Sequence, residues 1–183
     1  MTFSQKLISV AISLAPNSGT NQPNTFAESG TNTVNISASR FRCRIRNSGT
    51  PVDCAAQVDI YGVTPSLMNQ MSTLGLVFNQ LPTNTITIAA GDEKTGLSNV
   101  FTGTIVNAYG DYERQPDVPF TLVANLGIAQ AVVPAVVSSF QGTVNVADVM
   151  SGLARQMGMG FENNGVSVQI SNPYLSGSLW TQA

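Results

Sequence analysis

The sequence predicts a mainly β protein, α+β overall: an antiparallel β-barrel or sandwich with one short helix, followed by a small α/β piece. Three observations predict this class. Short segments in which apolar and polar residues alternate recur along most of the chain. Turn-forming Gly, Pro, Asn and Ser separate these segments. Hydrophobic residues make up 43% of the chain, which is enough for a packed core.

The predicted strands follow from the alternation. In residues 6–14, Val10 and Ile12 alternate with small residues, as on a half-buried strand. In residues 33–46 the alternation changes phase. Because side chains alternate with a period of two, this change requires a β-bulge or a sharp bend near residues 38–40. Further strands are predicted around residues 56–60, 77–81, 84–90, 100–109 and 118–125.

Two segments have helical spacing instead. A short helix is predicted to begin at Pro65, with Thr64 as its cap. A longer helix is predicted over residues 146–157, capped by Asn145 and ended by Gly158. Both helices carry an apolar stripe, so each is expected to pack on a core.

The change from strands to a helix after Pro134 divides the chain. We predict a β-barrel domain over residues 1–133 and a small, incomplete α/β domain over residues 134–183. Within the second domain, residues 162–165 predict a hairpin turn. Residues 178–183 predict the start of a helix with few partners.

Charge and composition argue against several classes of function. A net charge of −2 disfavours phosphate-driven binding of nucleic acid. The absence of His removes the usual general base and the commonest metal ligand. The close acidic sets, Asp92 with Glu93 and Asp111 with Glu113, lie in predicted loops. We therefore expect neither an enzyme nor a cofactor or metal site.

The N-terminal segment alternates as a strand does, which opposes its being a signal peptide. No apolar run approaches the ~20 residues that a membrane-spanning helix needs. We expect an unprocessed chain that is made in the cytoplasm and does not insert into a membrane.

The two cysteines fit neither a disulfide framework nor a zinc site. Cys43 alternates with Phe41 and Ile45, so we expect it to be a buried free thiol. If this strand pairs with the next as a hairpin, Cys43 lies opposite the region of Ile60, too far along to reach Cys54. Two free thiols are predicted.

Half of the eight basic residues occupy every second position of one predicted strand: Arg40, Arg42, Arg44 and Arg46. On an extended strand they project from one face. Matching of faces then places Asp59 and Tyr61 beside them. We expect Arg42 or Arg44 to pair with Asp59 and to stack on Tyr61.

One carboxylate cannot neutralise four arginines, so the remainder are expected to meet acidic groups of a neighbouring subunit. On this interpretation Arg40, Arg42, Arg44, Arg46, Asp59 and Tyr61 form an assembly interface rather than a DNA-binding surface. The alternative is a solvated outer face whose aliphatic stems cover apolar surface.

Two stretches carry a resemblance to a known family. The first comprises residues 42–47 and 57–75; the second comprises 88–92, the Phe-x-Gly-x-Ile pattern of residues 101–105, and 117–124. Together they resemble the first barrel of phage tail and baseplate hub proteins, the group that includes the late-control D proteins of contractile phages. The predicted helix over 146–157 resembles the start of the α/β domain that follows that barrel.

The resemblance implies a structural protein of the virion tail. In that family, trimers supply two similar barrels per subunit, and these form a pseudo-sixfold ring joining the tail tube to the spike. This chain has one recognisable barrel, so either it is part of a longer protein or single barrels form the ring. The family has no catalytic residues to carry over. The alternative function is a carbohydrate- or receptor-binding β-domain of a tail fibre.

Overall fold

The computed structural model of the protein describes residues 4–16, 24–48, 54–74, 84–132 and 134–183. These form two compact units, Met1–Gly127 and Ile128–Ala183. The boundary predicted from sequence, 133/134, lies a few residues after the observed division. The first unit is built on one antiparallel sheet, and the predicted mainly β, α+β class is confirmed.

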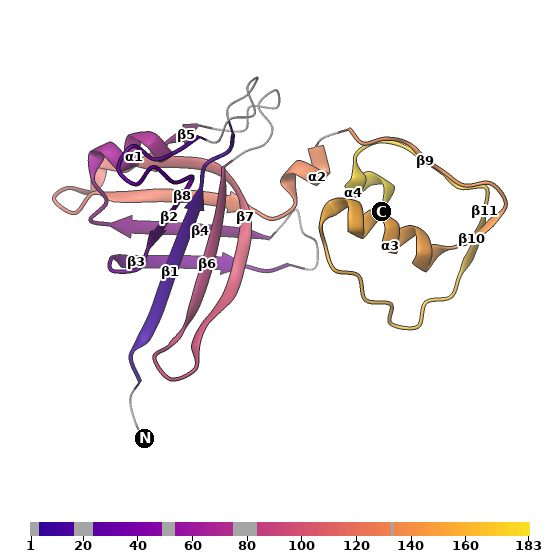
Figure 1. Cartoon of the computed structure of the whole chain (residues 1–183), viewed down its shortest axis with the longest axis horizontal. Coiled ribbons are helices and arrows are strands. Elements are labelled where there is room, and N and C mark those ends of the chain that lie inside the picture. The colour runs from indigo at the N-terminus through magenta and orange to yellow at the C-terminus, as the bar shows by residue number, and fades with distance from the viewer. Residues whose placement is uncertain (1–3, 17–23, 49–53, 75–83, 133) are drawn as a thin grey trace. The chain divides into compact units, whose positions relative to one another are not determined.

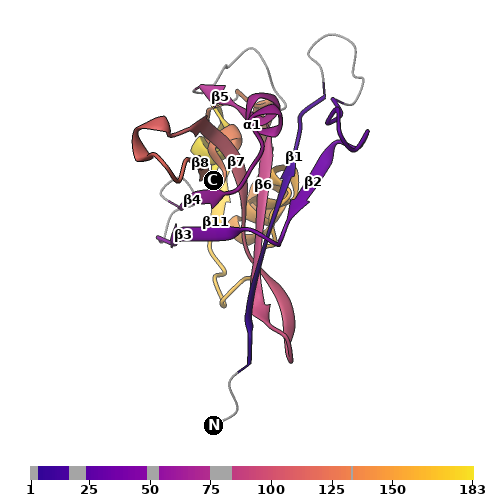
Figure 2. The ribbon, with the colours of Figure 1, turned by 90° about the vertical axis from the view of Figure 1, so that its left-hand side faces the viewer.

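The first unit contains the strands β1 (Lys6–Ser13), β2 (Thr33–Ile36), β3 (Arg40–Arg46), β4 (Ala55–Tyr61), β5 (Thr73–Leu74), β6 (Thr85–Asp92), β7 (Gly96–Gly110) and β8 (Pro119–Asn125). A helix, α1 (Pro65–Met71), and a short 3-10 helix, η2 (Tyr112–Arg114), interrupt them. The strand order is β2-β1-β6-β7-β8-β4-β3, with β5 on β7. β3 and β4 cross the direction of β1 and β6 (Figure 1). A long β6–β7 hairpin runs beside β1 (Figure 2).

The two edge strands of this sheet, β2 and β3, are consecutive in the chain. Residues 37–39 alone connect them, a link that spans at most about 15 Å. The sheet must therefore curl until its edges approach each other, as in an incompletely closed barrel. The predicted change of phase is confirmed, because the chain bends between β2, which pairs with β1, and β3, which pairs with β4.

The core of the first unit lies inside this curled sheet. Alternate residues of β1, β4, β6, β7 and β8 face inward, including Val10, Ile60, Ile86, Ile105 and Phe120. Phe26, Met68 and Met71 add to the same cluster from the segment before β2 and from α1. The predicted cap of α1 is confirmed, since the Leu67 N–H donates to Thr64 Oγ1 at 3.3 Å. The strand predicted at residues 77–81 lies outside the described residues.

The second unit has a separate apolar cluster around α3. Its elements are α2 (Ile128–Val132), β9 (Ser138–Ser139), β10 (Thr143–Asn145), α3 (Val146–Met157), β11 (Gln169–Ser171), β12 (Tyr174–Leu175) and α4 (Leu179–Gln182). The caps of α3 are confirmed: Asn145 accepts from the Ala147 N–H, and Gly158 is left-handed at φ 70°. Val149, Leu153 and Met157 form the buried centre of the cluster.

One expectation for this unit is wrong, and another is confirmed only in part. The hairpin predicted at residues 162–165 does not form, because β11 pairs with β10, which precedes α3 in the chain. Asn163 instead closes a local loop through hydrogen bonds with both backbone groups of Val166. A helix does start after Ser178, but it has more partners than expected. Trp180 packs on the α3 cluster, and Gln182 Nε2 donates to two carbonyl oxygens.

Within the part of the chain that the structure describes, no helix combines the length and the apolar character that crossing a bilayer requires.

Candidate interaction site

The four arginines of β3 share the outer face of the first unit. Their cross-strand partners on β4 are Tyr61 for Arg40, Asp59 for Arg42, Gln57 for Arg44 and Ala55 for Arg46. The intervening residues of β3 turn towards the core, where Phe41 and Ile45 pack against it. We call the outer side of β3 and β4 the arginine face.

Arg40 occupies the end of the arginine face. Its guanidinium carbon lies 3.9 Å from the centre of the Tyr61 ring. Its Nη1 lies 3.4 Å from Oδ2 of Asp117, with both side chains largely exposed. We expected Arg42 or Arg44 to stack on Tyr61, and that assignment is wrong. Arg40 stacks on the ring instead, because Arg40 lies directly opposite Tyr61 in the strand register.

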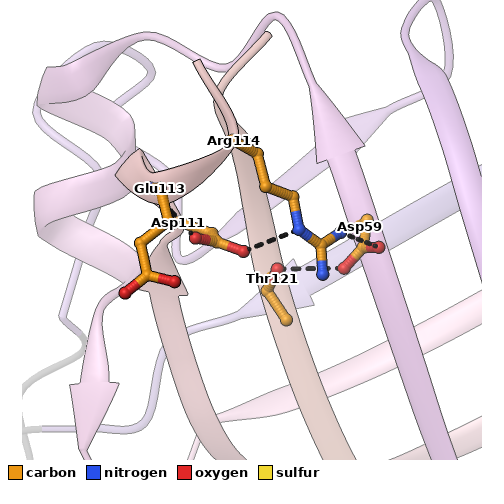
Figure 3. A network of polar contacts seen from close by, with 5 residues as sticks. All are labelled: Asp59, Asp111, Glu113, Arg114 and Thr121. Carbon is orange, nitrogen blue, oxygen red and sulfur yellow. Dashed lines mark hydrogen bonds and ion pairs between the residues drawn. The ribbon is translucent and has the colours of Figure 1, made fainter.

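Asp59 is buried on this outer face, with 4% of its surface exposed. Its Oδ1 accepts a hydrogen bond of 2.9 Å from Thr121 Oγ1, and its Oδ2 lies 3.5 Å from Nη1 of Arg114 (Figure 3). The predicted pairing of Asp59 with Arg42 or Arg44 is therefore wrong. Arg42 is the direct neighbour across the strands, but Arg114 reaches over β8 to the carboxylate.

The position of Arg114 follows from the turn between β7 and β8. Asp111 caps η2, accepting from the Glu113 N–H at 3.2 Å. The same carboxylate binds Arg114 Nε through its Oδ2 at 2.9 Å. Arg114 thus extends between two carboxylates, Asp111 and Asp59, as Figure 3 shows. Its side chain covers Asp59, which explains why a carboxylate on the outer face is buried.

A pocket of about 190 Å³ opens on the arginine face. Its lining consists of Arg42, Arg44, Gln57, Asp59 and Arg114. Among the described residues, Arg42 and Arg44 have no ion-pair partner, whereas Arg114 has two. The pocket therefore contains one carboxylate, that of Asp59, which already has partners. It also contains two guanidinium groups, those of Arg42 and Arg44, which have no ion-pair partner among the described residues.

A second, more apolar pocket of about 360 Å³ lies next to Tyr61. Tyr112 and Met68 also line it, together with Asp117, the partner of Arg40. Tyr112 is 59% exposed, so its ring is accessible to a ligand in this pocket.

The two close acidic sets have local structural roles. Asp92 closes the β6–β7 turn, accepting from the N–H groups of Lys94 and Thr95 at 2.9 and 2.8 Å. Hydrogen bonds from Thr95, from Lys94 and from the Lys6 side chain lower the pKa of Asp92 to about 2. Asp111 caps η2, as described above. Within the described residues, no cluster of three or more Cys, Asp or Glu side chains is suited to hold a metal.

Both cysteines are free thiols, as predicted. Cys43 lies opposite Val58, whereas Cys54 immediately precedes β4. The expectation that Cys43 is buried is wrong, since it is exposed whereas Cys54 is buried. β3 is an edge strand, so only one neighbouring strand covers the flank of Cys43. Partial desolvation nevertheless raises the pKa of the Cys43 thiol.

Sequence reasoning found the arginines but missed the residues that organise them: Asp111, Arg114, Asp117 and Thr121. Asp59 and Arg114 are 55 positions apart, so no local pattern connects them. The available signal was Thr121, which matches Asp59 once β4 and β8 are paired in register.

Comparison of the chain with known protein families and with curated proteins gives no match.

Proposed function

We propose that this chain is a structural component of a phage tail or baseplate hub, in which it forms a ring connecting the tail tube to the tip or spike. The observation that carries this proposal is the uncompensated charge of the arginine face. Arg42, Arg44 and Arg46 stand on an edge strand without an ion-pair partner among the described residues. Guanidinium groups in a row favour a partner surface that supplies carboxylates.

The fold and the sequence resemblance are compatible with this role. A curled antiparallel barrel followed by a small α/β unit is the order of elements that the resemblance to hub proteins implies. The Phe101-x-Gly-x-Ile105 pattern lies on β7, at the centre of the sheet, where Phe101 and Ile105 are buried. These features support the proposal at the level of architecture.

The low charge of the chain also suits a ring around a DNA channel. A net charge of −2 leaves little excess of positive groups to retain phosphates as DNA passes. On this proposal the partners are further copies of the chain, in a trimer or a pseudo-sixfold ring, and the tube and spike proteins on either side. The protein would be made in the host cytoplasm and incorporated into the virion tail.

The direct test is to purify phage particles produced with an intact gene and with a disrupted gene. We expect the chain to be detected in the tail fraction by mass spectrometry, and tails to be incomplete without it. Native mass spectrometry of the full-length protein at micromolar concentration should reveal a trimer or a ring. Normal tails without the gene, or a protein that is only monomeric, would contradict the proposal.

One observation favours a second candidate, a receptor- or carbohydrate-binding domain of a tail fibre. Tyr61 and the exposed Tyr112 line one pocket, and stacking on aromatic rings is a common way of binding sugars. A glycan array separates the two candidates. Binding that is lost in Tyr112→Ala supports the fibre domain, and the absence of binding supports the hub.

A further inference from the structure

The pocket between Arg42, Arg44 and Arg114 has an unbalanced charge. Its lining contains three guanidinium groups and the Asp59 carboxylate. Asp111 neutralises part of the Arg114 charge from outside the lining. Asp59 and Asp111 both pair with Arg114, so Arg42 and Arg44 are the two cations of the lining without an ion-pair partner among the described residues.

Among the described residues, Asp59 forms its ion pair with Arg114 and none with Arg42 or Arg44. Oδ1 accepts from Thr121, and Oδ2 faces Arg114 (Figure 3). Asp59 is also buried, with only 4% of the residue's surface exposed. Asp59 is thus held by Thr121 and Arg114 and is not a counterion of Arg42 and Arg44.

This arrangement suits a carboxylate. A planar carboxylate matches the fork of a guanidinium group and accepts two parallel hydrogen bonds from it. The volume of about 190 Å³ equals the share of about six liquid waters, enough for an acidic side chain and part of its backbone.

We propose that this pocket binds the carboxylate of a single Asp or Glu side chain from an adjacent protein subunit. Arg42 and Arg44 donate hydrogen bonds to the carboxylate, and the side-chain amide of Gln57 in the pocket lining is a further, neutral donor. Thr121 and Arg114 fix the position of the Asp59 carboxylate. The identity of the adjacent subunit as a tail component rests on the proposed function, whereas the chemistry of the pocket does not.

The chemistry is tested on the full chain in solution. The probe is the blocked peptide acetyl-Gly-Glu-Gly-amide, with the corresponding Gln peptide as the uncharged comparison. NMR should show saturable shifts of the Arg42 and Arg44 Nε–Hε signals, with a dissociation constant in the millimolar range. The Gln peptide should bind about tenfold more weakly or worse, because it lacks the negative charge. Equal shifts with the Gln peptide, or no saturable shift with the Glu peptide, would overturn the proposal.

The chain offers a matched control. Arg42→Gln/Arg44→Gln should lower the affinity for the Glu peptide about tenfold or more, while Lys94→Gln should leave it unchanged. Lys94 is an exposed cation in the turn between β6 and β7, and it does not line the pocket. Unchanged β4 and β8 amide signals verify that the variants are folded.

A second arm separates this inference from the proposed function. If the chain is found in tails but the Arg42→Gln/Arg44→Gln variant assembles as well as Lys94→Gln, the pocket is not the contact and the inference is overturned. If the Glu peptide binds as expected but the chain is absent from tails, the hub proposal fails and the carboxylate site stands. Loss of assembly in the double variant alone supports both.

Discussion

Asp59 is the residue at which sequence position and environment differ most. Among the described residues it is the only charged side chain that is buried, although it stands on the outer face of β4. A buried carboxylate without partners is strongly destabilising. Arg114 and Thr121 supply those partners, so the free energy of unfolding of the first unit should depend on them.

We expect Arg114→Gln to lower the free energy of unfolding by about 1–2 kcal/mol, because Asp59 loses its cation and the shorter Gln side chain covers it only in part. Arg40→Gln is the control, since the exposed Arg40–Asp117 pair contributes about 0–1 kcal/mol. Urea denaturation followed on the amide signals of β4 and β8 measures both variants. The Asp59→Asn/Arg114→Gln double variant should recover part of the loss. Equal effects of Arg114→Gln and Arg40→Gln would show that Arg114 does not compensate Asp59.

The two thiols give a second prediction for single residues. Cys43 is exposed and should react with N-ethylmaleimide in the folded chain, whereas Cys54, 6% exposed, should react only after unfolding. The raised pKa of Cys43 makes its labelling slower at pH 7 than that of a free thiol, and the rate should rise as the pH approaches and passes 9. A time course by mass spectrometry, with Cys43→Ser as the control, measures both effects. Simultaneous labelling of both cysteines would contradict the observed burial.

Among the elements, β7 shows why one glycine matters. Gly103 lies between Phe101 and Ile105, whose side chains enter the core. A Cβ atom at Gly103 would lie 2.7 Å from the Phe101 ring and 2.9 Å from the Asn125 carbonyl oxygen. The ring can shift, but the carbonyl belongs to the neighbouring strand β8 and has less freedom. The glycine of this pattern thus permits close packing of the Phe101 ring.

Gly103→Ala should therefore destabilise the first unit by about 1–3 kcal/mol. The matched control is Gly152→Ala in α3, where a Cβ atom meets nothing within 4 Å. Because Ala favours a helix over Gly, this control should stabilise the second unit by about 0.5–1 kcal/mol. Thermal denaturation followed on signals from each unit measures both changes. An unchanged stability of the Gly103→Ala variant would mean that the sheet accommodates the methyl group without strain.

For the molecule as a whole, the division into two units matters most. Each unit has its own apolar cluster, one inside the curled sheet and one around α3. The second cluster has only three buried residues at its centre among the described residues, Val149, Leu153 and Met157. Small cores contribute little stability, so the first unit is expected to be the more stable of the two.

A chain containing only residues 1–127 should consequently fold by itself. We expect its NMR spectrum to match the corresponding signals of the full chain, and its thermal unfolding to be a single cooperative transition. Dispersed signals that collapse in the shortened chain would show that the first unit needs residues 128–183. The same comparison on residues 128–183 should give the less stable unit.

The sequence by itself determined the features that depend on neighbours in the chain. The β-rich class, the bend between β2 and β3, the Thr64 and Asn145 caps and the end of α3 at Gly158 were all predicted correctly. Alternation with a period of two and capping within three residues are local rules, so they can be read without knowing the fold. The four arginines were likewise placed together by alternation alone.

Only the tertiary structure decided which distant residues meet. It placed β2 and β3 at opposite edges of one sheet, exposed Cys43, and paired β11 with β10 in place of a hairpin at residues 162–165. It also paired the Asp59 carboxylate with Arg114 instead of Arg42. Pairing between strands is set by burial of the whole apolar set and by the turns that deliver each strand, and these contacts leave no periodic trace in the chain.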